Sequence, residues 1–595
     1  MVYLVDDLAR MRMLMSGMYA ELGVSKAYCF SIFTPFLKKK LNLTQTEVTT
    51  ISTVGNCIMY FSFPSGALFD YAGPMVVLPI AGFLGFLGFL LFGLTFDRKI
   101  VSPGVGLLSF FNALVYCAFP ILDVSSVMPL MLQFPLDRGY IVLVSKTIGG
   151  LGTGVLMAYF NGWFKDTTSD DVEKNNYSGF AYFVAIQLVV VSLIAFALIR
   201  LPMYFPCAWR KQRLSEEEWT KRQQTLQLYM NQPAPPRRMK TAVGLVLSLL
   251  LFLTTQSLIG GYVKLPPAAY LAFSIIAVLM MASFCVVALP FQWLGRYTPV
   301  RPTDMDTIGE ALEDVVTESA VATTKNEVKP LPQYSGSFWQ HLLTVDLWCM
   351  WLTCFGVWGT AVVMQMNAAQ IYESKSYGEK KSSTLTLYIT MISVGSAVGR
   401  MSMGYLDMVL TRRQREGLKT FPTTIALPFC PLMLCIAFLL FALLPANALV
   451  LPFFLGSLGN GAGWGSVVLA FRIMYSQDLG KHYNFGFSSG IVSTIALNLF
   501  MFGGMYDAEA EKLGTKPECK QPSCVKNQML ILMGVNIVAV IAAAIVHFRF
   551  SRFINAEQNR CNEPADEMSG VAAPVTEDAG QPNEGGSHSG GAAQQ

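Results

Sequence analysis

Charged side chains are scarce in this sequence. Asp, Glu, Lys and Arg make up 14% of its 595 residues, whereas 53% of the residues are apolar. A soluble chain would carry about a quarter charged residues, so much of the exterior must face something other than water. The net charge of +4 gives no indication of a nucleic-acid partner. We therefore predict a monomeric membrane protein whose partners are the lipid bilayer and a small-molecule or ion substrate.

Motifs for nucleotide binding and for catalysis are also missing. The stretch IVLVSKTIGGLGTGVLMAYFNGWF at 141–164 places a lysine beside several glycines. A phosphate-binding loop has its glycines before the lysine, whereas Lys146 comes first here. No Ser/His/Asp, Cys/His or paired-carboxylate arrangement indicates an enzyme. The sequence thus predicts neither an enzyme nor an ATP-driven pump, and it implies no cofactor.

Residues that bind metals do not form a motif. The four histidines lie far apart in the sequence and include no H-x-x-x-H pair, so no preformed metal site is indicated. Most of the twelve cysteines lie in apolar runs and are typical of small buried residues. Cys519 and Cys524 are the exception, because they share a predicted outward loop in which a disulfide could form.

Long apolar runs, in contrast, are abundant. A helix needs about 20 residues to cross a bilayer, and about fourteen such runs are present. They lie near 16–36, 47–69, 74–96, 103–129, 138–163, 178–201, 240–261, 267–291, 342–370, 383–408, 422–444, 447–474, 485–505 and 527–549. We predict an all-α polytopic protein with an N-terminal half at 1–201, cytoplasmic loops flanking an inserted helix pair (240–291) at 202–340, a C-terminal half at 341–550, and a disordered tail at 551–595.

The loops indicate an orientation. Basic residues cluster at 210–240 and at 412–419, in two loops of the same parity, and both clusters lie inside if the N-terminus is cytoplasmic. Lys38, Lys39 and Lys40 would then lie outside, against that rule. With this orientation the glycosylation sequons at Asn42 and Asn176 face outward. The membrane itself, plasma or intracellular, is left open.

The two predicted halves carry related loops. The second helix of the first half ends in GALFDYAGP, with Gly66 before Asp70, and that of the last half in GRMSMGYLDMVLTRR, with Gly404 before Asp407. Both resemble the G-x-L-x-D loop motif of the major facilitator superfamily, although the first copy lacks the usual basic residues and the second has its aspartate one position early. The resemblance implies that these four residues take part in conformational gating.

Longer strings resemble the nodulin-like family within that superfamily. They are AYCFSIFTPFLKKKLNLTQTEV (27–48), LQFPLDRGYIVLVSKTIGGLG (132–152), NAAQIYESKSY (367–377) and DLGKHYNFGFSSG (478–490). The resemblance implies two six-helix halves and an alternating-access solute carrier. Some members, notably in protists, are associated with iron handling, and some relatives with monocarboxylates. It therefore implies iron or another metal species as the first candidate substrate.

Ionisable residues inside the predicted spans are the main candidates for function. Lys146 lies about 12 Å deep at 1.5 Å per residue, either facing a cavity or snorkelling to the interface. Arg400 resembles an arginine that binds substrate carboxylate in monocarboxylate carriers, or it tethers its helix. Asp123 is either a proton site or the partner of one of these cations. Asn367 and Gln370 share one predicted helix face and are candidates for an outer vestibule.

Three functions remain open at this stage. The first is secondary transport of a small anion or metal species, the second is proton-coupled transport of a monocarboxylate or other organic anion, and the third is a membrane sensor that transports nothing. Buried cations at Lys146 and Arg400 would repel a bare metal ion unless acids offset them. The physical argument therefore favours an organic anion or an anionic metal chelate, whereas the resemblance favours iron.

Overall fold

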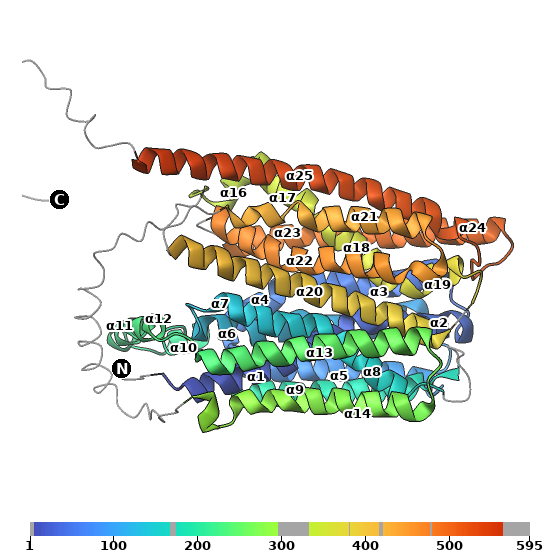
Figure 1. The fold of residues 1–595 in the computed structure, drawn as a ribbon, viewed down its shortest axis with the longest axis horizontal. Coiled ribbons are helices and arrows are strands. Elements are labelled where there is room, and N and C mark those ends of the chain that lie inside the picture. The colour runs from blue at the N-terminus through green and yellow to red at the C-terminus, as the bar shows by residue number, and fades with distance from the viewer. Residues whose placement is uncertain are drawn as a thin grey trace, which may run out of the picture. The chain divides into compact units, whose positions relative to one another are not determined.

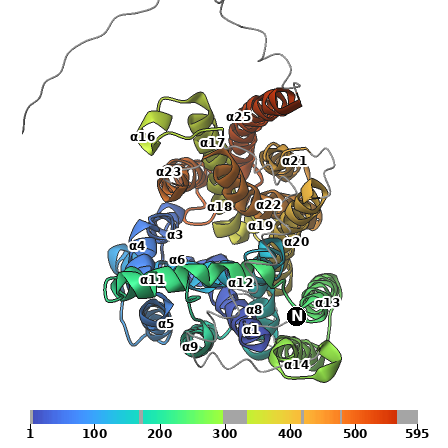
Figure 2. The same ribbon diagram turned by 90° about the vertical axis from the view of Figure 1, so that its left-hand side faces the viewer.

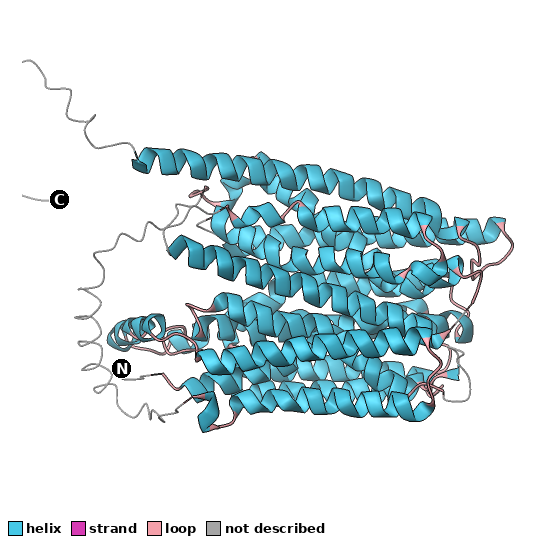
Figure 3. Cartoon of the chain, viewed as in Figure 1, coloured by secondary structure: helices cyan, strands magenta, loops and turns pink. Residues whose placement is uncertain are grey.

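The computed structural model describes residues 5–166, 174–295, 333–379, 381–415, 421–475 and 479–562. Within these ranges the regular secondary structure is helical (Figure 3). An isolated β-bridge joins Tyr334 to Tyr475. Residues 1–551 form one compact unit and residues 552–595 a second.

The N-terminal half consists of helices that follow one another with short connections. They are α1 (Asp7–Val24), η1 (Ser25–Cys29), α2 (Phe30–Lys40), α3 (Gln45–Tyr60), α4 (Phe63–Ala72), α5 (Pro74–Phe96), α6 (Val105–Gln133), α7 (Arg138–Ile141), η2 (Val142–Lys146), α8 (Thr147–Trp163) and α9 (Tyr177–Leu198). Short polar caps start several of them; at α3, for example, Thr44 and Glu47 form a reciprocal capping box.

The middle of the chain supplies three short helices and then the inserted pair. These elements are α10 (Ala208–Lys211), α11 (Glu216–Gln224), α12 (Leu226–Asn231), α13 (Pro236–Tyr262), α14 (Pro267–Ser283), η4 (Phe284–Ala288) and η5 (Gln292–Leu294). The predicted inserted pair at 240–291 therefore corresponds to α13 and α14. Most of the predicted loop at 293–340 lies outside the described residues.

The C-terminal half is, like the first half, a series of helices with short connections. Its elements are α16 (Phe338–His341), α17 (Val345–Cys354), η6 (Phe355–Gly359), α18 (Thr360–Met366), α19 (Ala368–Lys375), α20 (Ser382–Arg415), η7 (Thr423–Ala426), α21 (Phe429–Leu443), η8 (Ala446–Ala448), α22 (Val450–Met474), α23 (Leu479–Ser493), η9 (Thr494–Gly503), α24 (Gly504–Lys512) and α25 (Ser523–Asn562). The last helix extends past residue 551, where we expected a disordered tail; residues 563–595 of that tail lie outside the described residues.

Ten of the described helices are long and apolar enough to cross a membrane, which makes the chain a multi-pass membrane protein. The other four predicted spans, near 16–36, 47–69, 383–408 and 447–474, are not among these ten. The first is interrupted by η1 and the second by a break between α3 and α4. The third, in α20, contains Arg400 and many hydroxyl side chains, and the fourth, in α22, is rich in glycine, which lowers their mean hydropathy.

The two halves meet along α8 and α20. A Cβ atom added to Gly150 of α8 would lie 2.8 Å from the backbone nitrogen of Ala397 in α20. Such close approach of two backbones is typical of small residues in membrane helices. We call this contact of α8 with α20 the seam.

The inserted pair lies beside the seam. Figure 2 shows the two halves as separate groups of helices, with α13 beside α20 and α14 beside the first half. Leu253 of α13 contacts Gly154 of α8, and Leu387 of α20 packs on Gly261 of α13. The pair therefore covers part of the seam. Figure 1 places α11 and α12 at one end of the bundle and α24 at the other.

The linker after α9 is fastened to the first half. Arg10 of α1 is buried, and its guanidinium donates hydrogen bonds to the carbonyl oxygens of Gln133, Gln232 and Pro233 at 3.1–3.4 Å. Asp137 accepts the amide of Ala234 at 2.7 Å. The linker thus holds the ends of α1 and α6 together.

Candidate functional site

Three charged side chains of the N-terminal half meet at the centre of the bundle. Lys146, the last residue of η2, forms an ion pair with Asp123 of α6 and a second with Glu21 of α1, in which Nζ lies 3.2 Å from Oε1. The sequence interpretation of Asp123 as a partner of Lys146 therefore matches this geometry. Glu21 was not singled out, although it is an ionisable residue inside a predicted span.

A fourth charged side chain comes from the other half. Arg400 of α20 donates from Nη1 to the backbone carbonyl oxygen of Lys146 at 3.3 Å. It interacts electrostatically with Glu21, Asp123 and Lys146. We call Glu21, Asp123, Lys146 and Arg400 the charge cluster. Lys146 and Arg400, the two candidate cations of the sequence analysis, therefore lie close together, one on each side of the interface between the halves.

Local backbone structure brings the cluster together. Residues 142–146 form a π-helical turn, η2, and such turns are often found where a helix carries a functional side chain. The helix that follows, α8, has no side chain at Gly149, where an added Cβ would overlap Glu21 Oε2 and lie 3.1 Å from Arg400 Nη1. The acid and the guanidinium thus face each other across this glycine.

The charges of the cluster balance, but its members differ in exposure. Two carboxylates and two cations give a net charge of zero when all four are ionised. The side chains of Asp123 and Lys146 are 35% and 24% exposed, whereas that of Glu21 is fully buried. Arg400 is 7% exposed. Asp123 and Lys146 are therefore partly exposed, whereas Glu21 and Arg400 are enclosed by protein.

Aromatic rings from both halves lie together elsewhere in the interface. Tyr60 at the end of α3 stacks on Trp358 of η6 and Trp464 of α22, with ring centroids 6.2 and 6.5 Å apart, and Trp358 stacks on Phe487 of α23 at 5.1 Å. Tyr483, also in α23, is within electrostatic range of Asp123 and Arg400. The C-terminal half thus presents mainly aromatic surface to this part of the interface.

Asn367 and Gln370, the candidates for an outer vestibule, belong to a hydrogen-bond network between the halves. Asn367 accepts from Gln45 of α3 at 2.7 Å and donates to Asn498 of η9 at 2.7 Å. Gln370 donates to Thr34 of α2 at 3.0 Å. Asn367 is the N-cap residue of α19 and Gln370 lies within that helix. Both side chains are buried and hydrogen-bonded to the first half.

Asp507 of α24 completes this closed end. Its carboxylate accepts the amide of Gln45 at 3.1 Å and that of Thr46 at 2.7 Å, which are the first amides of α3. A carboxylate at a helix N-terminus satisfies free N–H groups and interacts favourably with the helix dipole. The hydrogen bonds of Asp507, Asn367 and Gln370 therefore close this end of the interface; we call them the outer network.

The two G-x-L-x-D-like loops differ in their surroundings. An added Cβ at Gly404 would lie 3.1 Å from the backbone of Leu143 in η2, so the second copy packs against the first half. Asp407, on the same helix, interacts electrostatically with Arg472. An added Cβ at Gly66 would meet nothing within 4 Å, and Asp70 is exposed. The second copy thus packs against the opposite half, whereas Gly66 and Asp70 of the first copy do not show such packing.

The sequons and the cysteine pair lie on loops. Asn42 and Asn176 are both exposed, and Asn176 also caps α9 by accepting the amide of Gly179 at 2.9 Å. Cys519 and Cys524 form a disulfide with a Cα–Cα distance of 6.0 Å. The carbonyl oxygen of Cys519 accepts the hydroxyl of Ser374 at 2.8 Å, which ties this loop to α19.

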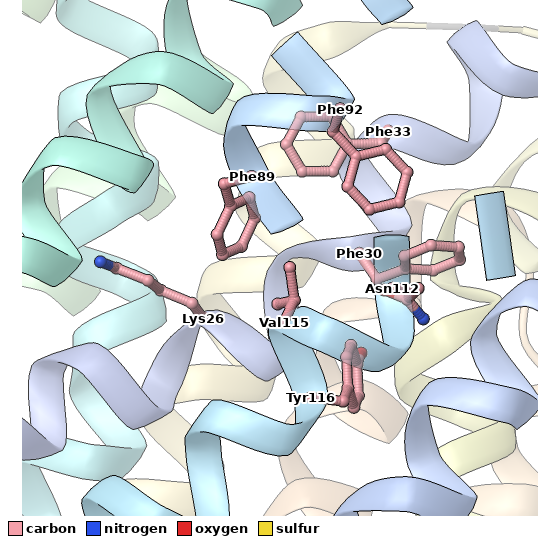
Figure 4. A pocket seen from close by; sticks show the side chains of 8 residues that line it. All are labelled: Lys26, Phe30, Phe33, Phe89, Phe92, Asn112, Val115 and Tyr116. Carbon is pink, nitrogen blue, oxygen red and sulfur yellow. The ribbon is translucent and has the colours of Figure 1, made fainter. Parts of the chain in front are cut away.

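A small cavity inside the first half is lined by Lys26 and by apolar and aromatic side chains (Figure 4). Its volume of about 10 Å³ has room for about one water molecule and not for a solute. Figure 4 shows the Lys26 side chain directed away from the rings, and its Nζ donates to the carbonyl oxygen of Val184 at 3.1 Å. We assign this cavity no part in the site.

No group of three or more His, Cys, Asp or Glu side chains that could hold a metal ion occurs among the described residues. Two histidines that are far apart in the sequence do meet, however. His341 Nδ1 and His482 Nε2 lie 2.8 Å apart and both rings are buried, beside the rings of Tyr334 and Tyr475. The separation of 141 residues explains why no sequence motif marks this pair.

Comparison with known proteins gives the same fold. Residues 11–289 match the family described as nodulin-like. No protein with a curated description matches the chain. Among solved structures, a mutant peptide transporter POT in complex with sulfate has a TM-score of 0.50 at 12% identity, covering 90% of this chain and 94% of that one. The xylose transporter XylE from E. coli has a TM-score of 0.49 at 10% identity, covering 90% and 98%.

The likeness to the peptide transporter bears on the fold alone, and it agrees with the helical bundle described above. The sequence resemblance noted for the strings at 27–48 and 132–152 is confirmed, since both lie within the matched region. Residues 11–289, somewhat less than half of the chain, are therefore similar to the nodulin-like family, and the chain has the fold of the POT peptide transporter.

Proposed function

We propose that this protein carries a small anionic solute across the membrane by alternating access, with Lys146 and Arg400 as its anion-binding pair. The observation that carries the proposal is the meeting of these two cations, one from each half, in one charge cluster. A ligand held by both would contact both halves at once. Alternating access requires such a site, because the halves rock about the bound solute.

The charges of the cluster favour an anion over a bare cation. Lys146 and Arg400 would attract a carboxylate, and Arg400 offers a planar fork that binds carboxylates with two hydrogen bonds. Glu21 and Asp123 offset the two cations while no ligand is bound, which lowers the cost of keeping charges away from water. A carboxylate would bind by replacing one of these acids as the partner of a cation.

A metal species is compatible with this site only in one form. Glu21 and Asp123 both pair with Lys146, and two carboxylates beside two cations would bind a bare metal ion poorly. An anionic metal chelate, in contrast, presents carboxylates to the same cations. Iron, which the family resemblance suggests, would therefore travel as such a chelate, and a simple organic anion is the alternative.

Transport by purified protein in proteoliposomes tests the proposal. We expect uptake of radiolabelled lactate, or of radiolabelled iron as its citrate complex, and strong loss of that uptake in Lys146→Gln. The matched control is Lys221→Gln, because Lys221 is exposed on α11 and pairs only with Glu217 among the described contacts. Absence of flux for both probes with folded wild-type protein would argue against an anion carrier and for a membrane sensor.

A further inference from the structure

Gly149 separates an acid of one half from a cation of the other. Its missing side chain leaves space into which Glu21 Oε2 projects from α1 and Arg400 Nη1 projects from α20. The other carboxylate oxygen of Glu21 contacts Lys146 Nζ at 3.2 Å. Glu21 is therefore the acid that lies between the two cations of the proposed anion site.

Binding of an anion changes the net charge of the charge cluster. The cluster is neutral when its four members are ionised, so a bound carboxylate would leave one negative charge without a partner. An isolated charge inside a membrane protein is costly. Uptake of one proton by an acid of the cluster would restore neutrality.

The geometry indicates which acid takes the proton. Asp123 is 35% exposed and keeps its direct ion pair with Lys146, so water and that contact can stabilise its charge. Glu21 is fully buried; its Oε1 contacts Lys146 Nζ, and its Oε2 accepts no hydrogen bond from the described residues and borders the same space at Gly149 as Arg400 Nη1. A buried carboxylate that loses its cationic partners is stabilised by protonation.

We propose that Glu21 is the proton-coupling residue of this carrier. The space left by the missing side chain of Gly149 brings the Glu21 carboxylate close to Arg400, so that protonation of Glu21 releases Arg400 for the substrate. The inference rests on the proposed anion site. One proton from the more acidic side binds a carboxylate oxygen of Glu21 as one monovalent anion binds Lys146 and Arg400. The same O–H bond breaks after the halves have rocked, when the anion leaves and Glu21 returns to the cations.

Two transport modes in proteoliposomes separate coupling from binding. Uptake driven by a pH gradient requires release of the proton in each cycle, whereas exchange of internal for external anion does not. We expect Glu21→Gln to lose gradient-driven accumulation of radiolabelled lactate and to retain exchange. Gradient-driven accumulation by Glu21→Gln at the wild-type level would overturn the inference.

The pH dependence of binding provides a second readout that a merely structural role would not move. If one proton binds with lactate, the apparent affinity of the wild-type protein should fall by about tenfold per pH unit above the range in which Glu21 stays protonated. Glu21→Gln should show no such dependence. A wild-type affinity independent of pH would overturn the inference while leaving an anion carrier intact, whereas no binding at any pH would overturn the proposed function.

Gly149→Ala tests the gap itself. The added methyl group would overlap the Glu21 carboxylate and push it from Arg400, so we expect a weaker pH dependence of lactate binding per folded molecule. The control is Gly244→Ala in α13, where an added Cβ meets nothing within 4 Å. Equal pH dependence in Gly149→Ala and in the control would remove Gly149 from the coupling scheme.

Discussion

Ser393 of α20 bridges two backbone groups of α8 that belong to successive turns. Its hydroxyl donates to the carbonyl oxygen of Gly150 at 2.6 Å and accepts from the amide of Gly154 at 2.9 Å. In a regular helix these two groups would be partners of each other, four residues apart. A side chain of the second half is thus hydrogen-bonded into a helix of the first, which requires that α8 carry glycine at the contact.

The seam leads to a ranked prediction for its glycines. An added Cβ would lie 2.8 Å from backbone atoms of Ala397 at Gly150, but 3.3 Å from side-chain atoms at Gly154. Side chains can move aside more easily than backbone, so Gly150→Ala should destabilise the protein more than Gly154→Ala, by about 1–3 kcal/mol. Thermal melting of purified protein measures the difference. Leucine at either position should prevent normal folding, and wild-type stability of both leucine variants would disprove the close-packing argument.

Arg400 should not be replaceable by lysine. Arg400→Lys keeps the charge but loses the bidentate fork, so folded protein should be obtained while the apparent affinity for a carboxylate substrate falls about tenfold or more, for a loss of about 1.5–3 kcal/mol. The measurement is flux per folded molecule over a range of substrate concentrations. Arg549→Lys is a suitable control, because Arg549 pairs with Asp346 at 2.7 Å in another part of the C-terminal half. Unchanged affinity in Arg400→Lys would mean that Arg400 only tethers its helix.

The outer network should hold the protein closed at that end. Asp507→Ala removes the acceptor for two amides of α3, which should weaken the closed state by about 1 kcal/mol, or about fivefold in population. Labelling of Ser52→Cys by a membrane-impermeant thiol reagent would report the opening, in a background without other accessible cysteines. Glu509→Ala on the same helix is the control, since Glu509 pairs with Lys512 and not with the first half. Equal labelling rates in the two variants would exclude Asp507 as a latch.

The disulfide should stabilise the same end of the molecule. Replacing Cys519 and Cys524 by serine frees a short loop that is otherwise tied to α19 through Ser374. We expect a stability loss of about 2 kcal/mol, seen as a lower melting temperature. A reducing agent should lower the melting temperature of the wild-type protein and leave that of the double variant unchanged. A response of both proteins to the reducing agent would point to another disulfide.

Much of the architecture followed from the sequence because the bilayer imposes a simple rule. A helix that crosses lipid must be long and apolar, so the runs of apolar residues already marked the two halves, the inserted pair and the linker. The same rule marked Lys146, Arg400 and Asp123, since an ionisable residue in an apolar run is unusual. It also marked α20 and α22, although serine, glycine and arginine lower their mean hydropathy and they are not among the ten candidate spans.

Only the tertiary structure decided which of these residues meet. The rotation of each helix about its axis depends on packing with neighbours, so a sequence position does not tell whether Glu21 faces lipid, protein or the centre. Glu21 lies 125 residues from Lys146, and Lys146 lies 254 residues from Arg400, yet folding brings them into one cluster. The glycines of α8 read as a smooth helix surface in the sequence. Their individual roles, Gly150 against Ala397 and Gly149 between Glu21 and Arg400, depend on which helix each one faces.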